Sequence, residues 1–333
     1  MKAHRSLSFR TLHCNLLAAL AFALIGNPAL ASEDTTTGVK EISANQYHLT
    51  SNACRLAIDV NAHIGGRITQ LLFDGKPVIW PYACTADTYQ PNSGCNGSGS
   101  TFWTSPQKAW PNGGWPPVAS VDGEAYTAHV KNDHLLLNGP GNALLGARIN
   151  KDFSIDSEHC IVDLRYTINA SRAQHIAPWE ITRVKRGGIA FFPLGDRNKL
   201  SAGPLASRVS IAGNVVWFDD TGMPVLPLSG GAKLIADGRG GWLAYVAQGK
   251  LYIKRFDDVT PEATAPGEGD IEIYADGEFL ELEVQGRYTS LNAGDALPWN
   301  VQWRVVTVPE SVTIAAGSKS LLQFVEQEVS TTR

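Results

Sequence analysis

The sequence predicts an all-β fold, in which antiparallel sheets pack as a sandwich, on three observations. Apolar and polar residues alternate with a period of two in many short segments. Turn pairs such as Asp74-Gly75, Asn138-Gly139 and Asp276-Gly277 separate these segments. No segment shows a sustained apolar stripe with a period of 3.6 residues, which is the pattern of a helix that buries one side.

The alternation is clearest in segments 54–60 and 160–166, each with a cysteine on its apolar side. Because successive side chains of a strand point to opposite faces, this pattern indicates strands that bury one face. Further strands are expected at 67–73, 134–137, 209–212, 215–218, 242–246, 251–255, 271–274, 279–285, 300–308 and 320–325.

The first 31 residues have the pattern of a signal peptide. Basic residues precede the apolar run Leu16–Ile25, and Ala29-Leu30-Ala31 then supplies the small residues of a cleavage site. The apolar run is too short to span a membrane. We therefore expect residues 1–31 to be removed, and the protein to be periplasmic or extracellular without a membrane anchor.

The rest of the chain shows neither a linker nor an internal repeat. Residues 32–44 are polar and are expected to be a disordered N-terminus of the mature protein. Residues 45–326 are expected to form one large β domain, and residues 327–333 a C-terminal tail.

The formal net charge is −4, with charges of both signs interspersed. This distribution argues against nucleic acid or an anionic membrane as a partner.

The chain has five cysteines, four of which follow the expected leader: Cys54, Cys84, Cys95 and Cys160. An oxidising compartment permits disulfides. Cys84 and Cys95 bracket a short segment rich in Gly, Asn, Ser and Pro, and we predict that they form a bridge. Cys54 and Cys160 could pair across the core or remain free thiols. Because there is no close cysteine pair and no histidine cluster, we expect no metal and no other cofactor.

Segment 99–117 is rich in tryptophan and proline, and includes Trp103, Trp110 and Trp115. Since proline lacks a backbone donor and fixes φ, we predict a surface loop here. Indoles beside polar groups such as Gln107 suit a ligand with apolar faces and polar edges, such as a sugar. The alternative is a loop that folds back and buries its own tryptophans as a lid over the core.

Two further segments carry candidate chemistry. In the expected strand 279–285, Glu281 and Glu283 share one face, about 6.5–7 Å apart. Such a pair could act in general acid–base catalysis, or it could be the solvated face of a sheet. Trp179, Glu180 and Arg183 lie within five positions of one another. They could frame a sugar, or they could form a structural ion pair beside a packed indole.

Two internal motifs, Gly99–Gln107 and Ala177–Val184, resemble the signature of a bacterial family of unknown function with a galactose-mutarotase-like fold. The resemblance extends over roughly residues 45 to 326. It implies a β-supersandwich whose concave sheet binds carbohydrate. The segments that resemble the opening and closing strands of this fold are 47–52, 56–60, 65–71, 282–285, 291–295 and 301–303.

The resemblance also bears on catalysis. In aldose epimerases a glutamate removes the anomeric hydroxyl proton and two histidines assist. Glu283 falls where this glutamate is expected, with Glu281 as the competing register. Val184 stands where one histidine motif requires histidine, and the tryptophan-rich segment takes the place of the other. The usual general acid is thus missing.

We therefore predict a carbohydrate-binding protein, in which the four tryptophans of these segments stack on sugar faces. The polar candidates would bond the sugar hydroxyls. A second hypothesis is a sugar-active enzyme, an epimerase, hydrolase or lyase, with Glu283 as general base. A third is a structural module whose tryptophans all belong to the core. A carbohydrate ligand is the only partner that the sequence predicts.

Overall fold

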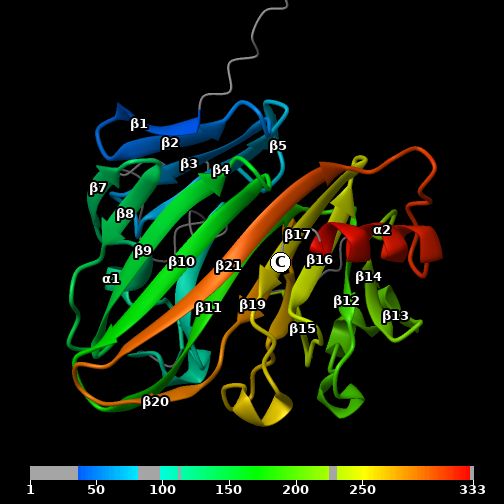
Figure 1. Cartoon of the computed structure of the whole chain (residues 1–333). Coiled ribbons are helices and arrows are strands. Elements are labelled where there is room, and N and C mark those ends of the chain that lie inside the picture. Colours follow the sequence, from blue (N-terminus) through cyan, green and yellow to red (C-terminus); the bar gives the residue numbers. More distant parts are fainter. Residues whose placement is uncertain (1–36, 82–97, 112–113, 225–230, 331–333) are drawn as a thin grey trace, which may run out of the picture. The chain divides into compact units, whose positions relative to one another are not determined.

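The computed structural model describes residues 37–81, 98–111, 114–224 and 231–330 (Figure 1). The described residues all belong to one compact unit. The described residues are mostly strands, arranged in two antiparallel sheets, so the predicted all-β class is confirmed. The expected leader, residues 1–31, and the expected bridge between Cys84 and Cys95 lie outside the described residues.

The first sheet has 11 strands, and its main order is β1-β2-β3-β4-β6-β11-β19-β18-β15. β5 pairs with β4, and β20 pairs with β11. Its strands are β1 (Thr37–Ser43), β2 (Gln46–Ser51), β3 (Leu56–Asn61), β4 (Arg67–Phe73), β5 (Lys76–Pro77), β6 (Ser100–Ser105), β11 (Gln174–Lys185), β15 (Ala232–Ala236), β18 (Ile271–Ala275), β19 (Phe279–Gln285) and β20 (Thr289–Leu291).

The second sheet has 10 strands in the order β13-β14-β12-β16-β17-β21-β10-β9-β8-β7. Its strands are β7 (Thr127–Lys131), β8 (His134–Asn138), β9 (Ala147–Asp156), β10 (Ile161–Ala170), β12 (Ile189–Pro193), β13 (Val209–Ala212), β14 (Val215–Asp219), β16 (Trp242–Ala247), β17 (Lys250–Phe256) and β21 (Ala296–Thr307).

The main core lies between the two sheets. Phe102 of β6 stacks on Tyr166 of β10 with ring centroids 4.5 Å apart, and both side chains are buried. Apolar residues that alternate along each strand supply the rest of this cluster. The sheets therefore pack face to face, and each keeps a second face directed away from the core.

The segment 37–43, which the sequence predicts to be disordered, forms strand β1. It pairs with β2 along its length, from Thr37 opposite Ser51 to Ser43 opposite Gln46. Its side chains are half-buried or exposed, so the strand is held mainly by backbone hydrogen bonds at the sheet edge. A hydrophobicity pattern does not reveal such a strand, because it buries little apolar surface.

The C-terminal segment is helical, which corrects two expectations. α2 (Lys319–Ser330) replaces both the expected strand 320–325 and the start of the expected tail 327–333. Leu321, Val325 and Val329 are its buried residues, and their spacing of four is a helical period. They pack on an apolar cluster formed by β12, β14, β16 and β17. α2 thus covers part of the outward face of the second sheet, across the β14 and β16 strands in Figure 1.

The remaining helices are short. α1 (Ala119–Asp122) and the 3₁₀ turn η3 (Gln107–Ala109) follow β6. Three further 3₁₀ turns, η5 (Arg197–Lys199), η6 (Gly203–Arg208) and η7 (Pro261–Ala263), lie in the loops of the second half of the chain. Within the described ranges, no helix has the length and apolar character needed to cross a membrane.

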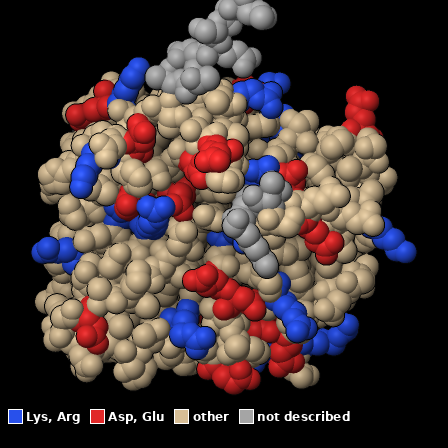
Figure 2. All heavy atoms as spheres, in the orientation of Figure 1, with Lys and Arg blue, Asp and Glu red and all other residues tan. Residues whose placement is uncertain are grey.

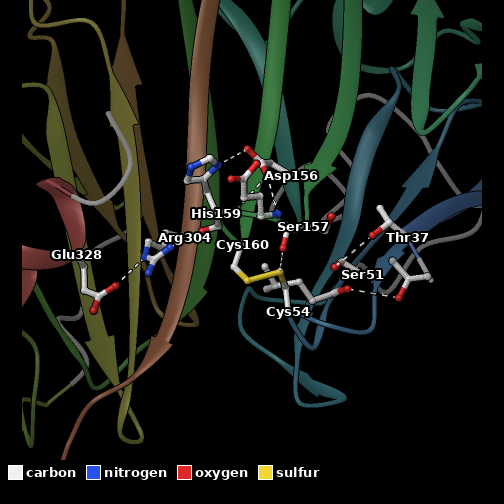
Figure 3. The surroundings of a disulfide bond; sticks show 12 residues. Thr37, Ser51, Cys54, Asp156, Ser157, His159, Cys160, Arg304 and Glu328 are labelled. Carbon is white, nitrogen blue, oxygen red and sulfur yellow. Dashed lines mark hydrogen bonds and ion pairs between the residues drawn. A yellow bond between two sulfur atoms is a disulfide. The ribbon is translucent and has the colours of Figure 1, made fainter. Parts of the chain in front are cut away.

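A disulfide joins Cys54 to Cys160, so the sequence alternative in which these two pair is the one that forms. Cys54 lies between β2 and β3 of the first sheet, and Cys160 lies between β9 and β10 of the second. Arg304 of β21 donates to the carbonyl of His159 and pairs with Glu328 of α2 at 2.7 Å (Figure 3). The bridge and these contacts link both sheets and α2 at one corner.

Candidate functional site

Most of the predicted site residues lie on three adjacent strands of the first sheet, β6, β11 and β19. Trp103 lies opposite Trp179, and Arg183 lies opposite Glu281. Since alternate residues of a strand share a face, Glu283 lies on the same face as Glu281. This face points away from the core. We call it the polar face; with contributions from β18 and β15 it comprises Trp103, Trp179, Arg183, Lys233, Glu272, Glu281, Glu283 and Gln285.

Local sequence explains how β6 begins. Gly99 has φ +63°, and a Cβ at this position would lie 2.3 Å from the carbonyl oxygen of Ile68. Glycine therefore lets the chain pass close to β4 before β6 starts. The expectation that all of 99–117 is a loop is wrong for Ser100–Ser105, because the prolines of the segment begin only at Pro106.

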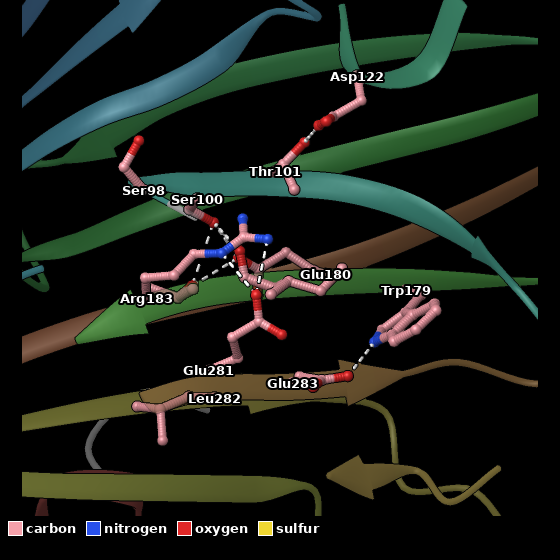
Figure 4. Close-up of polar contacts among 12 residues, drawn as sticks. Ser98, Ser100, Thr101, Asp122, Trp179, Glu180, Arg183, Glu281, Leu282 and Glu283 are labelled. Carbon is pink, nitrogen blue, oxygen red and sulfur yellow. Dashed lines mark hydrogen bonds and ion pairs between the residues drawn. The ribbon is translucent and has the colours of Figure 1, made fainter. Parts of the chain in front are cut away.

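Lys233 is the centre of the charges on the polar face. Its Nζ lies 2.7 Å from Glu272 Oε2 and 2.9 Å from Glu283 Oε2. The ammonium also lies 4.7 Å from the ring centroid of Trp179, a cation–π distance. Trp179 Nε1 in turn donates to Glu283 Oε2 at 3.0 Å (Figure 4). One cation thus holds two buried carboxylates and one indole in place.

Burial governs the protonation of these groups. It raises the pKa of Glu272 and of Glu283, because both carboxylates are removed from water, although Lys233 acts in the opposite direction. For Lys233, burial disfavours the charge, but the attraction of the two carboxylates outweighs it and raises the pKa. Perturbed pKa values of this kind occur at structural ion pairs and at functional sites.

A second ion pair lies beside the first. Both Nε and Nη2 of Arg183 lie 2.8 Å from Glu281 Oε1 (Figure 4). The guanidinium carbon lies 5.1 Å from the ring centroid of Trp103. The sequence left open whether Arg183 frames a ligand or pairs beside an indole, and the structure shows the pairing.

Glu180 lies apart from the other candidates. It is on the core side of β11, because it neighbours Trp179 in a strand. Its Oε2 lies 2.5 Å from Lys254 Nζ of the second sheet, and both side chains are fully buried. Ser100 and Thr182 donate hydrogen bonds to its Oε1. Glu180 therefore ties the two sheets together, away from the polar face.

The four predicted tryptophans form one cluster, with Trp103 at its centre. The ring of Trp103 makes edge contacts with Trp110, Trp115 and Trp179 at centroid distances of 5.3, 5.8 and 5.3 Å. Trp103, Trp110 and Trp179 are buried, whereas Trp115 is 44% exposed. Three of the indoles thus pack inward, and one faces solvent.

Trp115 lines a hollow of about 390 Å³ beside η3. The backbone N–H of Gln107 donates to Glu268 Oε1 at 2.9 Å, and its Nε2 donates to the carbonyl of Gly114 at 3.0 Å. The first bond fixes η3 to the loop before β18, and the second fixes it to the segment that carries Trp115. We call this the Trp115 hollow; its lining is Gln107, Lys108, Gly114, Trp115, Pro266, Gly267 and Glu268.

Sequence reasoning missed Lys233, Glu272 and Glu268. A signal for Glu272 was present, because the alternation in Ile271–Tyr274 separates it from its apolar neighbours. The approach of Lys233 depends on β15 lying beside β18 and β18 beside β19, which no local pattern encodes. In the portion of the chain that the structure describes, no three His, Cys, Asp or Glu side chains are grouped to hold a metal ion.

Two of the solved structures that share this fold are described as a sugar epimerase and an epimerase homologue. An aldose epimerase homologue from C. elegans has a TM-score of 0.54 at 10% identity, over 82% of this chain and all of that chain. Galactose 1-epimerase from Lactobacillus acidophilus has a TM-score of 0.51 at 11% identity, over 83% of this chain and all of the other. The predicted galactose-mutarotase-like fold is thus confirmed.

The fold also occurs within a larger protein. A TPR-domain-containing protein from Parabacteroides distasonis has a TM-score of 0.53 at 13% identity, over 81% of this chain but 49% of that chain. No curated protein sequence matches the chain. Residues 45–306 match the family model described as "Domain of unknown function (DUF4380)".

Proposed function

Because this chain belongs to the DUF4380 family, whose function is undefined, we propose a function from its site: it is a carbohydrate-binding protein that holds its ligand in the Trp115 hollow. The observation that carries the proposal is the half-exposed indole of Trp115, fixed by Trp103 and bordered by amide and charged side chains. The galactose-mutarotase-like fold supports a sugar-related role.

The chemistry of the hollow suits a sugar. The flat indole of Trp115 would pack against the apolar face of the ring, as aromatic side chains do at sites that are partly apolar and partly wet. Gln107, Lys108 and Glu268 would bond the hydroxyls at the ring edge. The edge contact between Trp103 and Trp115 fixes the indole before the ligand arrives, which reduces the entropy cost of binding.

The polar face would hold Trp115 in position through a series of side-chain contacts. Trp179 and Trp103 are in edge contact, and Trp103 in turn contacts Trp115. Lys233 and Arg183 anchor the first two indoles through their cation–π contacts. The ion pairs would thus act as a rigid base, and the ligand would meet the outermost indole of the cluster.

A second candidate function is sugar chemistry with Glu283 as general base. It is favoured by the raised pKa of Glu283 and by its Oε1 atom, for which the described residues offer no hydrogen-bond partner. Against it, the side chain is fully buried and its Oε2 is held by Lys233 and Trp179. A base must reach the proton that it removes, so we place binding first.

Isothermal titration with a panel of monosaccharides and short oligosaccharides tests the proposal. We expect the Trp115→Ala variant to bind at least about tenfold more weakly than wild type, because loss of a stacked aromatic typically costs over 1 kcal/mol. Ile42→Ala, which removes an exposed apolar side chain on β1, is the matched control and should bind as wild type does. Absence of binding by wild type, or equal binding by Trp115→Ala, would contradict the proposal.

Polarimetry separates the second candidate. Faster mutarotation of freshly dissolved aldoses by wild type, abolished in Glu283→Gln, would establish catalysis. If wild type does not accelerate mutarotation, the epimerase hypothesis is wrong and the binding proposal stands.

We also infer that the protein works outside the cytoplasm, after loss of residues 1–31 as a signal peptide. The Cys54–Cys160 disulfide supports this, because such bridges persist in oxidising compartments. N-terminal sequencing of the protein exported by a bacterial host tests it. A mature chain that starts at Ser32 is expected, whereas retention of the leader on the exported protein would contradict it.

A further inference from the structure

A pocket of about 210 Å³ lies where three parts of the chain meet. They are the end of β6 with the segment after it, the loop between β8 and β9, and the turn between β10 and β11. The pocket shares no lining residue with the Trp115 hollow, and most of its lining is apolar. We call it the Arg172 pocket; the apolar side chains that line it include Pro106, Trp110, Pro111, Val118, Leu145 and Ile176.

Hydrogen bonds hold the walls of the pocket in place. The carbonyl of Gly146, in the loop between β8 and β9, accepts from the backbone N–H of Ser171 at 2.8 Å and from Gln174 Nε2 at 2.7 Å. This loop is thus tied to the turn between β10 and β11. In the segment after β6, Trp110 Nε1 donates to the carbonyl of Thr104 at 2.6 Å. A pocket with fixed walls binds its ligand at a lower entropy cost.

Arg172 is held across the loop between β8 and β9. Its Nη2 donates to the carbonyl of Leu144 at 3.0 Å. Gly146 has φ +68°, and a Cβ at this position would lie 2.3 Å from Arg172 Nε. Glycine therefore lets the arginine side chain lie directly over the loop. The guanidinium is fixed in position beside the pocket, although Arg172 is exposed to solvent.

Arg172 is not paired with an acid. In the described part of the chain, its guanidinium bonds the Leu144 carbonyl and has no ion pair with a carboxylate. No described residue that lines the pocket is acidic, and His175 adds a ring nitrogen that can donate a hydrogen bond. Figure 2 shows acidic and basic side chains scattered over the face in view, without a broad basic surface. An arginine without an acidic partner is thus a local feature that can select an anion.

The rim of the pocket beside the guanidinium is apolar. Leu144 lines the pocket and is 66% exposed. A ligand with an apolar body would remove part of this side chain from water, which is favourable. The pocket therefore presents a cation at its mouth and apolar side chains within, the arrangement that suits a ligand with a charged end and an apolar body.

We propose that the Arg172 pocket binds a small carboxylate with an apolar body, such as an aromatic or alicyclic acid. The free N–H groups of the planar guanidinium would donate two parallel hydrogen bonds to the carboxylate. The apolar body would lie against Trp110, Leu145 and Ile176. The volume lies below the range of about 300–1,000 Å³ that is typical of drug-sized ligands, so the ligand is small. The inference does not depend on the Trp115 hollow.

The test is a ligand-observed NMR titration of the full chain with benzoate, phenylacetate, 3-phenylpropionate and cyclohexanecarboxylate, each beside its neutral amide. We expect at least one carboxylate to bind, and its amide to bind at least about fivefold more weakly, because hydrogen bonds to charged groups are stronger. Arg172→Met, which removes the charge and keeps an apolar stem, should weaken binding of the acid by a similar factor. Arg148→Met, at an exposed arginine of β9 outside the lining, is the matched control and should leave the affinity unchanged.

A second variant guards against a disturbed loop in the first. Leu144→Asp, at the exposed rim beside the guanidinium, would pair with Arg172 and repel the ligand. It should therefore weaken binding of the acid while the circular dichroism spectrum stays that of wild type.

The inference is overturned if no carboxylate binds, if every amide binds as tightly as its acid, or if both variants bind as wild type does. It is also overturned if Trp115→Ala abolishes binding of the acids, because they would then occupy the Trp115 hollow. Sugar titrations report on that hollow separately, so the two proposals can fail independently.

Discussion

The ammonium of Lys233 lies 2.9 Å from a carboxylate oxygen of Glu283, although β18 separates their strands in the sheet. The long lysine side chain reaches across β18, and the same ammonium pairs with Glu272 of that strand at 2.7 Å. Three consecutive strands are thus joined through one nitrogen atom. Trp179 connects the tryptophan cluster to these residues, because it donates to Glu283 and lies under the Lys233 ammonium.

We therefore expect Lys233→Met to destabilise the protein strongly. Both carboxylates are fully buried, and removal of the cation would leave them without their ion-pair partner. Breaking a buried pair in this way typically costs about 3–5 kcal/mol. Urea denaturation followed by circular dichroism measures the change in the free energy of unfolding. Lys131→Met, at an exposed position of the edge strand β7, should change it by less than about 0.5 kcal/mol. Equal effects of the two variants would show that the junction contributes little.

Asp270 should make stability depend on pH. Burial raises its pKa to about 7, and the nearby Asp237 and Asp258 carboxylates add to the shift against the hydrogen bond from Gly238. The folded protein then keeps this proton up to about pH 7, whereas the unfolded chain loses it near the ordinary value of 3.8. The contribution to stability is therefore fully present below about pH 4 and is lost as pH rises to 7.

Asp270→Asn should remove this dependence, because the amide keeps the oxygen that accepts from Gly238 and cannot ionise. We expect a stability similar to wild type at pH 4 and a higher stability at pH 8, by an amount on the order of a few kcal/mol. Thermal unfolding between pH 4 and 8 measures it. Asp133→Asn, at an exposed turn, should follow the wild-type profile. A slope that persists in Asp270→Asn would assign the dependence to other groups.

Iodide quenching should report on one indole of the tryptophan cluster. Trp115 is 44% exposed, whereas Trp103, Trp110 and Trp179 are buried. We expect Trp115→Phe to remove most of the quenching of the cluster, and a bound sugar to protect wild type to a similar extent. Trp80→Phe, at a half-buried position outside the cluster, should not alter the protection. Quenching that survives in Trp115→Phe and still responds to sugar would place the ligand elsewhere.

The packing of α2 can be tested separately from the site. Leu321 is fully buried against the apolar cluster on the outward face of the second sheet. Leu321→Ala should destabilise the protein by about 2–5 kcal/mol, since it leaves a cavity. Gln323→Ala, at an exposed position of the same helix, should be nearly neutral. Chemical denaturation compares the two, and a neutral Leu321→Ala would mean that α2 is only loosely attached.

The period-two alternation predicted most strands because it depends on burial of one face, as in β10 and β19. It failed for β1, which is held by backbone pairing at an edge. It failed also for α2, where six residues are too few to distinguish a helix from a strand. The hydrophobicity pattern predicts a strand when burial of one face of side chains stabilises it. It is less informative for an edge strand held by backbone hydrogen bonds and for a short segment near the end of the chain.

The site was predictable to the extent that it depends on strand parity and on the family resemblance. Glu281 and Glu283 share the face of Arg183 as their spacing implies. If segment 174–185 had been predicted as a strand, the same alternation would have placed Glu180 and Trp179 on opposite faces of the sheet. The burial of Trp103 beneath Trp115 and the reach of Lys233 depend on tertiary packing, so a single sequence does not reveal them.

The polar face joins positions that are remote along the chain. The Trp179–Glu283 hydrogen bond spans 104 residues, and the Lys233–Glu283 contact spans 50. Contacts of such long range make folding slow, because loops must close before the contacts form. The tryptophan cluster therefore has its full support only when β11, β19, β18 and β15 have all paired. A ligand that recognises the finished cluster would bind no earlier intermediate, and it would raise the apparent stability of the native state by mass action.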